Sequence, residues 1–236
     1  MILNTSGVIR DSDLKFYFDP AIAGSKFNGN EWYDLSENGH VGVSADGSPE
    51  IVDEFGGVLR TDGTTDQLQL KESTTTNLNN ITVSFFVKYE SLTNGNGSGV
   101  QMVIYFGQLP TGSNVSIGRR NSKHIAWGPS GFIYVQTADS VGPVVDRWYC
   151  YTYTNDGSTH KLYIDGELRG TNTPTSNPST TNTNILLSGW RTPTSNMGSW
   201  RENFKGDMGP LLLYDRVLTA EEVKQNFDAF RGRYGI

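Results

Sequence analysis

Apolar and polar residues alternate along much of this chain, the period-two pattern that is typical of β-strands with one buried face. The clearest rows are residues 14–18 and 81–89. In the second row the odd-numbered residues share one face, while Thr82, Ser84 and Lys88 lie on the other. Further strands are predicted at residues 100–106, 132–137, 148–154, 161–164, 185–188 and 211–214. Short strands separated by many Asn-Gly and Asp-Gly turns predict a sandwich or a barrel.

The strongest hairpin signal is the segment HKLYIDGELRG at residues 160–170. Leu162 and Ile164 alternate into the pair Asp165-Gly166, and both turn residues tolerate the positive φ of a type I′ turn. We expect Leu168 to resume the same apolar face on the return strand. The polar tract 171–184 that follows has no apolar anchor, so it is predicted to be an exposed loop.

A helix is predicted only at the carboxyl end. Thr219 and Glu222 have the spacing of a capping box, and Leu218 and Val223 are placed for a hydrophobic staple. Three apolar residues then recur at helical spacing and predict one stripe that packs on the sandwich. These residues are Val223, Phe227 and Phe230, and Gly232 is expected to end the helix.

Composition and charge exclude several classes of partner. The 236 residues suffice for one large β domain, and with 36% hydrophobic and 19% charged residues and 27 Gly they fit a loop-rich β protein. The formal net charge is −6, and no basic cluster exceeds Arg119-Arg120, so we expect neither nucleic acid nor an anionic membrane as partner.

Cys150 is the only cysteine, which excludes an intrachain disulfide. The start lacks the apolar stretch of a secretory signal, and no segment approaches the roughly 18 apolar residues of a membrane span. Because no intrachain disulfide can form and the initiating Met is present, folding in a reducing cytoplasm is expected.

Four segments, in order along the chain, resemble the laminin-G-like jelly-roll family of the concanavalin A-like lectin/glucanase superfamily. They are DLKFYFDPA with EWYDLSENGH, ITVSFFVKYESL, DRWYCYTYTNDGSTHKLYIDGELRG, and FKGDMGPLLLYDRVLTAEEVKQNFDAFRGRYGI. The resemblance implies an all-β, two-sheet antiparallel β-sandwich (jelly roll, concanavalin A-like) with a short C-terminal α-helix, and it makes Trp32 and Trp148 core residues. Residues 13–236 are expected to form one domain, and residues 1–12 an N-terminal arm that is free to contact a neighbouring molecule.

No residue is predicted to be catalytic. Glucanases of this fold carry E-x-D-x-E on one strand face, but the nearest string here, EIVDEF, has Val52 at the middle position. Glu50 and Glu54 would share a face without the central carboxylate, so solvated surface residues are the favoured interpretation. Cys150 is predicted to be a small buried core residue. His124 and His160 are interpreted as ordinary strand-end residues, because no G-x-S-x-G or comparable nucleophile motif accompanies them.

Calcium is a candidate cofactor, because many members of this superfamily hold one through Asp side chains and backbone carbonyls. Asp19, Asp34 and Asp207 lie in the matching regions. None has the ligand spacing of an EF-hand loop. Turn capping by these residues is the favoured interpretation, so no metal site or other cofactor is predicted.

Carbohydrate binding usually combines an aromatic platform with polar groups beside it, and aromatic residues in loops are the candidates. The pairs Trp190-Arg191 and Trp200-Arg201 flank the loop TPTSNMGS, and Trp127 stands beside Gly128-Pro129. We therefore predict a carbohydrate-binding surface at Trp190, Arg191, Trp200, Arg201 and Trp127. Packing of these rings beneath the loops is the alternative.

The function expected from these observations is binding without catalysis. The carboxyl-terminal pattern, YDRVLTAEEVKQNF and RGRYGI, is similar to that of structural proteins of tailed bacteriophages. The resemblance implies a structural or accessory virion protein, a capsid decoration or tail component, that contacts other virion proteins and cell-surface glycans. We expect it to be a homo-oligomer or a multicopy component of the particle, where many copies supply avidity. The alternatives are a bacterial carbohydrate-binding module and a glycoside hydrolase of the same fold.

Overall fold

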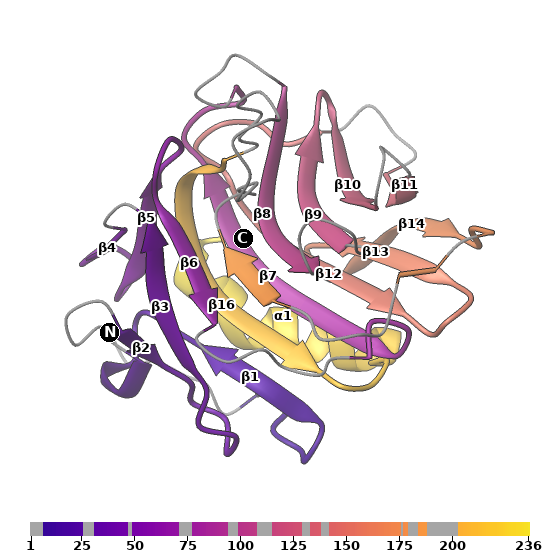
Figure 1. Ribbon diagram of the computed structural model, residues 1–236, viewed down its shortest axis with the longest axis horizontal. Coiled ribbons are helices and arrows are strands. Elements are labelled where there is room, and N and C mark those ends of the chain that lie inside the picture. Colours follow the sequence, from indigo (N-terminus) through magenta and orange to yellow (C-terminus); the bar gives the residue numbers. More distant parts are fainter. Residues whose placement is uncertain are drawn as a thin grey trace.

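The chain folds into two antiparallel β-sheets backed by one helix (Figure 1). The computed structural model describes residues 7–25, 31–46, 49–70, 77–93, 99–107, 115–128, 133–137, 142–175, 177–178, 184–187 and 203–236. The elements in chain order are β1 (Leu14–Phe18), the 3-10 helix η1 (Ala23–Ser25), β2 (Glu31–Tyr33), β3 (Val41–Asp46), β4 (Glu50–Val52), β5 (Val58–Asp62), β6 (Gln67–Leu70), β7 (Ile81–Tyr89), β8 (Val100–Gly107), β9 (Val115–Arg120), β10 (Lys123–Trp127), β11 (Ile133–Gln136), β12 (Trp148–Asn155), β13 (His160–Ile164), β14 (Glu167–Asn172), β15 (Asn184–Leu187), β16 (Lys205–Tyr214) and α1 (Ala220–Tyr234).

Each sheet joins strands that are distant in sequence. The first sheet has the order β14-β13-β12-β7-β16-β5-β4, and β1 pairs with the second half of β16. The second sheet has the order β11-β10-β9-β8-β15-β6-β3-β2. Neighbours such as β7 and β16 lie far apart in the chain, which is the crossing-over expected of a jelly roll. The predicted antiparallel β-sandwich with a C-terminal helix is therefore confirmed.

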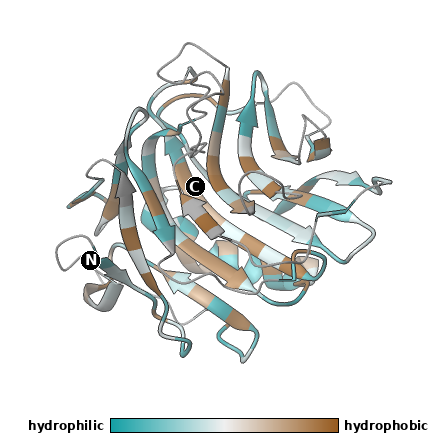
Figure 2. Cartoon of the chain, in the orientation of Figure 1, coloured by the Kyte–Doolittle hydropathy of each residue, from teal (hydrophilic) through white to brown (hydrophobic). Residues whose placement is uncertain are grey.

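The main core lies between the two sheets and is built from the alternating residues. All five odd-numbered residues of β7 are buried there. They meet inward-facing residues of the second sheet such as Ile104 and Ile117. The alternation is visible as recurring brown segments along the strands in Figure 2. Trp32 is 1% exposed and contacts Phe16 and Phe18 edge-on, so its predicted place in the core is confirmed.

A second core lies between the first sheet and α1, which Figure 1 shows in yellow behind that sheet. The helix buries its predicted stripe of Val223, Phe227 and Phe230. Phe86, from the face of β7 opposite the main core, meets Phe227 and Phe230 with ring centroids 6.4 and 5.7 Å apart. The central strand is therefore buried on both faces, because α1 covers the face that a plain two-layer sandwich exposes to water.

The helix begins as predicted and ends later than predicted. The Thr219 side chain accepts from the Glu222 amide, while the Glu222 carboxylate accepts from the Thr219 amide, so the capping box is confirmed. The helix continues through Gly232 to Tyr234. Gly235 is the C-terminal cap, with the left-handed φ of 69° that glycine tolerates best. Gly232 therefore does not end the helix, and the sequence pattern placed the end three residues too early.

The hairpin of β13 and β14 has the predicted turn, but its return strand differs from the prediction. Asp165 and Gly166 have φ of 54° and 78°. This two-residue turn places Glu167 opposite Ile164 and Leu168 opposite Tyr163. Leu168 therefore lies on the face of Tyr163, where it is 50% exposed. The expectation that it would rejoin the apolar face of Leu162 and Ile164 is wrong, because the turn length fixes the register.

Residues 7–13 lie against α1 and the end of β16. Val8 is buried in the second core. The Ile9 amide donates to Oδ1 of Asn226 over 3.0 Å, and its carbonyl accepts from the Tyr214 hydroxyl over 2.8 Å. Asp11 forms an ion pair with Arg216 over 2.7 Å. Residues 7–12 of the predicted arm thus make contacts within the chain, and residues 1–6 lie outside the described residues. No helix among the described residues has the length and apolarity of a membrane span.

Candidate functional site

Only one of the five predicted carbohydrate-binding residues lies within the described part of the chain. Trp190, Arg191, Trp200 and Arg201 lie outside the described residues. Trp127 ends β10, on the sheet face opposite the core residue Ala126, and it is partly exposed. The guanidinium carbon of Arg120 lies 5.2 Å from the centre of its ring. Trp127 is therefore a candidate aromatic platform for a sugar, but the Arg120 guanidinium already lies against its ring.

A second candidate lies where the edges of the two sheets meet. A pocket of about 220 Å³ is lined from the second sheet by His124 and Thr137 and from the first by Arg147, Tyr149, Ile164, Asp165 and Arg169. We call it the intersheet pocket. Asn172 of β14 donates to the carbonyl of Tyr134 of β11 over 2.7 Å, which joins the two sheets beside it. A few polar groups from several elements thus converge in one hollow, the usual form of a small-ligand site.

The turn between β13 and β14 supplies the carboxylate of the pocket. Asp165 Oδ1 accepts from the Cys150 amide, and Oδ2 accepts from Nη2 of Arg147, each over 2.8 Å. Partial burial raises the pKa of Asp165 above its ordinary value, against the opposing effects of these two bonds. The Arg147 guanidinium also lies 4.4 Å from the centre of the Tyr149 ring. Asp165 and Tyr149 together fix Arg147 at the rim.

A β-bulge supplies the second guanidinium. Leu162 pairs with Gly170 and Tyr163 pairs with Leu168, so Arg169 has no partner across the ladder. Bulges commonly redirect a side chain next to a functional site. Here the bulged residue lines the intersheet pocket. The Nη2 atom of Arg169 donates to Glu167 over 2.6 Å, and both side chains are largely in solvent, 45% and 67% exposed.

The inner wall of the pocket is buried and polar. His124 is 2% exposed, and its Nδ1 shares a hydrogen bond with the Tyr151 hydroxyl. Thr137 is 1% exposed, and its hydroxyl has no hydrogen-bond partner among the described residues. A buried hydroxyl without a partner costs free energy. Val144 and Val145, which shortly precede Arg147 in the chain, are 52% and 45% exposed, and the Val144 amide donates to the Tyr149 hydroxyl over 2.9 Å.

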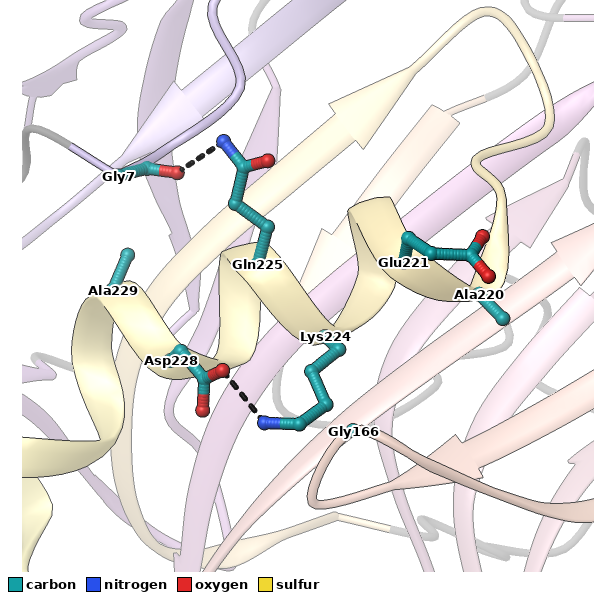
Figure 3. A pocket seen from close by; sticks show the side chains of 8 residues that line it. All are labelled: Gly7, Gly166, Ala220, Glu221, Lys224, Gln225, Asp228 and Ala229. Carbon is teal, nitrogen blue, oxygen red and sulfur yellow. Dashed lines mark hydrogen bonds and ion pairs between the residues drawn. The ribbon is translucent and has the colours of Figure 1, made fainter.

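A larger hollow lies along α1 and is less suited to a ligand. It measures about 720 Å³ and is a wide, open groove between the exposed face of the helix, Gly166 and Gly7 (Figure 3). Three of its four polar side chains already bind within the chain. Lys224 forms an ion pair with Asp228 over 2.6 Å, and Gln225 donates to the Gly7 carbonyl over 2.9 Å.

A third hollow, of about 560 Å³, gathers carboxylates beside β4, β5 and β16. Its lining includes four acidic residues, Glu50, Asp62, Asp66 and Glu90, and two basic residues, Arg60 and Lys205. Partial burial raises the pKa of Asp62, but hydrogen bonds from Thr64 and from the amides of residues 64–66 outweigh this and hold it well below the ordinary value. A general acid needs the opposite shift. Asp62 is thus a turn-capping residue.

The structure separates Glu50 from Glu54. Strand β4 ends at Val52, and Glu54 lies in the following turn, where it forms an ion pair with Arg60 over 3.1 Å. Glu50 is exposed and lies opposite Arg60 in the ladder. The two carboxylates therefore do not lie on one strand face.

The three candidate calcium ligands each have protein partners. Asp19 forms a buried bidentate ion pair with Arg233, both bonds 2.7 Å long. Asp207 binds Arg60 over 2.7 Å and Lys88 over 2.9 Å. Asp34 accepts from the amides of Tyr17 and Ser36, each over 2.8 Å, as a turn-capping residue does. The described residues contain no group of three or more His, Cys, Asp or Glu side chains placed to hold a metal ion.

Sequence reasoning placed part of the intersheet pocket and missed the rest. It located the Asp165 turn and the burial of Cys150, which is confirmed. It treated His124 as a strand-end residue, whereas His124 is the second residue of β10 and is buried in the pocket wall. Arg147, Arg169 and Thr137 carried no sequence signal, because their meeting depends on a bulge and on contact between the two sheet edges.

Comparisons with known proteins agree with this architecture. The family model described as "Concanavalin A-like lectin/glucanases superfamily" matches residues 62–224. No curated protein matches the sequence. Domain 4 of the extracellular GH43 arabinanase AbnA from Geobacillus stearothermophilus, solved with arabinotriose, is similar with a TM-score of 0.69 and 19% identity over 92% of this chain and 98% of that one.

Two further solved structures contain the fold as part of a larger chain. The binding domain of Paraclostridial Mosquitocidal Protein 1 matches with a TM-score of 0.64 and 15% identity, over 92% of this chain and 52% of that one. Trypanosoma rangeli sialidase matches with a TM-score of 0.65 and 14% identity, over 94% of this chain and 33% of that one. At these identities the likeness shows a shared fold. Because the family model covers most of the chain and the two-sheet architecture agrees with it, the protein belongs to the concanavalin A-like lectin/glucanase superfamily.

Proposed function

We propose that this protein is a non-catalytic, glycan-binding module and that the intersheet pocket is its binding site. The observation that carries the proposal is the convergence of Arg147, Asp165, Arg169 and Thr137 on one hollow of about 220 Å³. These groups combine hydrogen-bond donors with acceptors, as a sugar's hydroxyl groups require. Exposed aliphatic surface at Val144 and Val145 suits the apolar C–H groups of the ring.

The size of the pocket favours a single sugar unit. A volume of about 220 Å³ is smaller than the roughly 300–1,000 Å³ of pockets that enclose drug-sized ligands. A terminal residue of a surface polysaccharide fits this limit better than an internal stretch of a chain. Binding by one such unit is weak, and multiple copies of the protein would raise it by avidity.

The carboxylate content of the intersheet pocket supports binding without turnover. Glycoside hydrolysis normally uses two carboxyl groups on either side of the scissile bond. Among the residues that line the intersheet pocket, Asp165 is the one carboxylate, and it is held by Arg147 and by the Cys150 amide. A glycoside hydrolase acting at the hollow beside Glu50 remains the less favoured alternative.

We propose a tailed-phage particle as the setting, with the protein as a capsid decoration or tail component in contact with other virion proteins. The support is the carboxyl-terminal resemblance in sequence, which falls on β16 and α1. A bacterial carbohydrate-binding module is the alternative. It is favoured by the similarity to a domain of an extracellular arabinanase, which was solved with a bound oligosaccharide.

Glycan binding is tested by screening the purified protein on an array of bacterial surface polysaccharides. The pocket variant Thr137→Val should lose binding, while Trp127→Ala should retain it. Loss of binding in Trp127→Ala with full binding in Thr137→Val would move the site to the outer face of the second sheet. A protein that binds no polysaccharide on the array would refute the proposal.

The particle setting is tested separately by mass spectrometry and imaging of purified phage particles. We expect the protein in many copies on the capsid or tail. Its absence from the particles would leave the bacterial carbohydrate-binding module as the function.

A further inference from the structure

We propose that the sugar bound in the intersheet pocket carries a carboxylate group, and that Arg147 and Arg169 bind this group. The inference rests on the proposed glycan-binding function and adds the chemical class of the ligand. It commits to an acidic sugar, such as a uronic acid residue, and to two named side chains.

The local charge of the pocket is opposite to that of the chain. The lining residues include two guanidinium groups and one carboxylate, with His124 the remaining titratable group apart from Tyr149. The sequence as a whole has a formal net charge of −6. A positive excess in a hollow of an otherwise acidic protein attracts anions to that place and disfavours them elsewhere on the surface.

Arg147 is positioned before a ligand arrives. Its Nη2 atom donates to Asp165, and its guanidinium carbon lies 4.4 Å from the centre of the Tyr149 ring. A guanidinium carries five N–H donors in a rigid fork, so donors remain on Arg147 when the bond to Asp165 is made. Asp165 is in turn fixed by the Cys150 amide. An arginine that is already ordered loses little conformational entropy when it binds a carboxylate.

Arg169 brings the second cation through the bulge in β14. Its present partner, Glu167, is 67% exposed and does not line the pocket. Exposed ion pairs of this kind contribute little, so a ligand carboxylate can replace Glu167 at small cost. Such a bond inside the pocket is screened less by solvent than the exposed pair, which makes it stronger than the pair it replaces.

The test is calorimetric titration of the full chain with matched sugars. Glucuronate, galacturonate and N-acetylneuraminate are each compared with a neutral counterpart, and sodium acetate serves as the carboxylate without a sugar. We expect at least one acidic sugar to bind roughly tenfold or more tightly than its neutral counterpart, the ratio that one charge-assisted hydrogen bond supplies. Rising salt should weaken that binding.

Variants then assign the charge to the two arginines. Arg169→Gln and Arg147→Gln should each lower the affinity for the acidic sugar by roughly tenfold or more, while Arg169→Lys should lower it less. Arg120→Gln, which removes an arginine outside the pocket, should leave it unchanged. Thermal unfolding of each variant checks that the fold is intact, and Arg169 is exposed enough for its replacement to be tolerated.

The outcomes separate this inference from the proposed function. Equal affinity for acidic and neutral sugars would overturn the inference and leave glycan binding standing. Acetate that binds as tightly as the acidic sugar would overturn it as well, since the site would then recognise a simple anion. A protein that binds no acidic or neutral sugar in any assay would refute the proposed function itself.

Discussion

The ion pair between Arg233 and Asp19 ties the last turn of α1 to the segment that follows β1. The Asp19 side chain is fully buried and that of Arg233 is 7% exposed. Two hydrogen bonds of 2.7 Å join them, and the Ala21 amide donates to the same carboxylate over 3.0 Å. We therefore choose Arg233→Met, which keeps an unbranched apolar side chain and removes the positive charge.

The cost follows from what the change leaves behind. Asp19 becomes a buried carboxylate without its counter-ion, and removing one partner of such a pair costs about 3–5 kcal/mol of unfolding free energy. For a chain of this length, that loss corresponds to a fall in melting temperature of roughly 6–20 °C. The exposed pair Lys224–Asp228, also on α1, provides the matched control. Lys224→Met should cost no more than about 1 kcal/mol.

Urea unfolding followed by tryptophan fluorescence gives the free energies. Asp19→Asn and the double variant Asp19→Asn/Arg233→Met complete a double-mutant cycle. We expect the double variant to be more stable than the sum of the two single losses predicts, because it contains no uncompensated buried charge. An Arg233→Met protein within about 1 kcal/mol of the wild type would refute the reasoning, since a solvated pair behaves in that way.

Three further predictions concern packing, capping and pH. Gly42→Ala places a Cβ atom 1.9 Å from a Trp32 ring carbon, so overpacking should cost about 1–3 kcal/mol of unfolding free energy in the same urea assay. Gly232→Ala places a Cβ atom with no other atom within 4 Å and should stabilise α1 by up to about 1 kcal/mol. Equal effects of the two changes would contradict the packing around Trp32. Thr219→Ala removes the helix cap and should lower the unfolding free energy by about 1 kcal/mol, with a fall in melting temperature as the readout. Burial raises the pKa of Asp207, but bonds from Arg60 and Lys88 outweigh it and hold the pKa below its ordinary value. The unfolded chain therefore takes up this proton first as the pH falls below about 4, and stability is lost there. Asp207→Asn should flatten the pH dependence of the unfolding free energy in that range, and an unchanged slope would contradict it.

The sequence predicted the strands in which apolar and polar residues alternate and missed several strands without that alternation. Residues 81–89 alternate between apolar and polar except at Phe86, and the structure has β7 at those positions. The strand Glu167–Asn172 is exposed along nearly its whole length, so no apolar row marks it, and the Asp165-Gly166 turn predicted it instead. Strands β3 and β9 include glycine and polar residues, and their pairing with β6 and β8, rather than local preference, makes them extended.

The functional site was harder to predict than the fold, because it depends on where strands end. The turn at Asp165 could be read from the Asp-Gly pair alone. The position of Arg169 in the pocket requires the bulge opposite Leu162 and Tyr163, which shifts register by one residue and leaves no trace in composition. The approach of Thr137 and Arg169 depends on contact between β11 and β14, and single-sequence patterns do not encode such a contact.

The single cysteine, Cys150, allows local opening of the structure to be measured by thiol labelling. Cys150 is buried between the first sheet and α1, and burial raises the pKa of its thiol to about 12. A thiol-reactive dye can therefore modify the native chain only after β12 separates from the helix or from its neighbours. The labelling rate then reports how often this layer opens. Slower labelling in the presence of a candidate sugar would show that a sugar in the intersheet pocket keeps the layer closed.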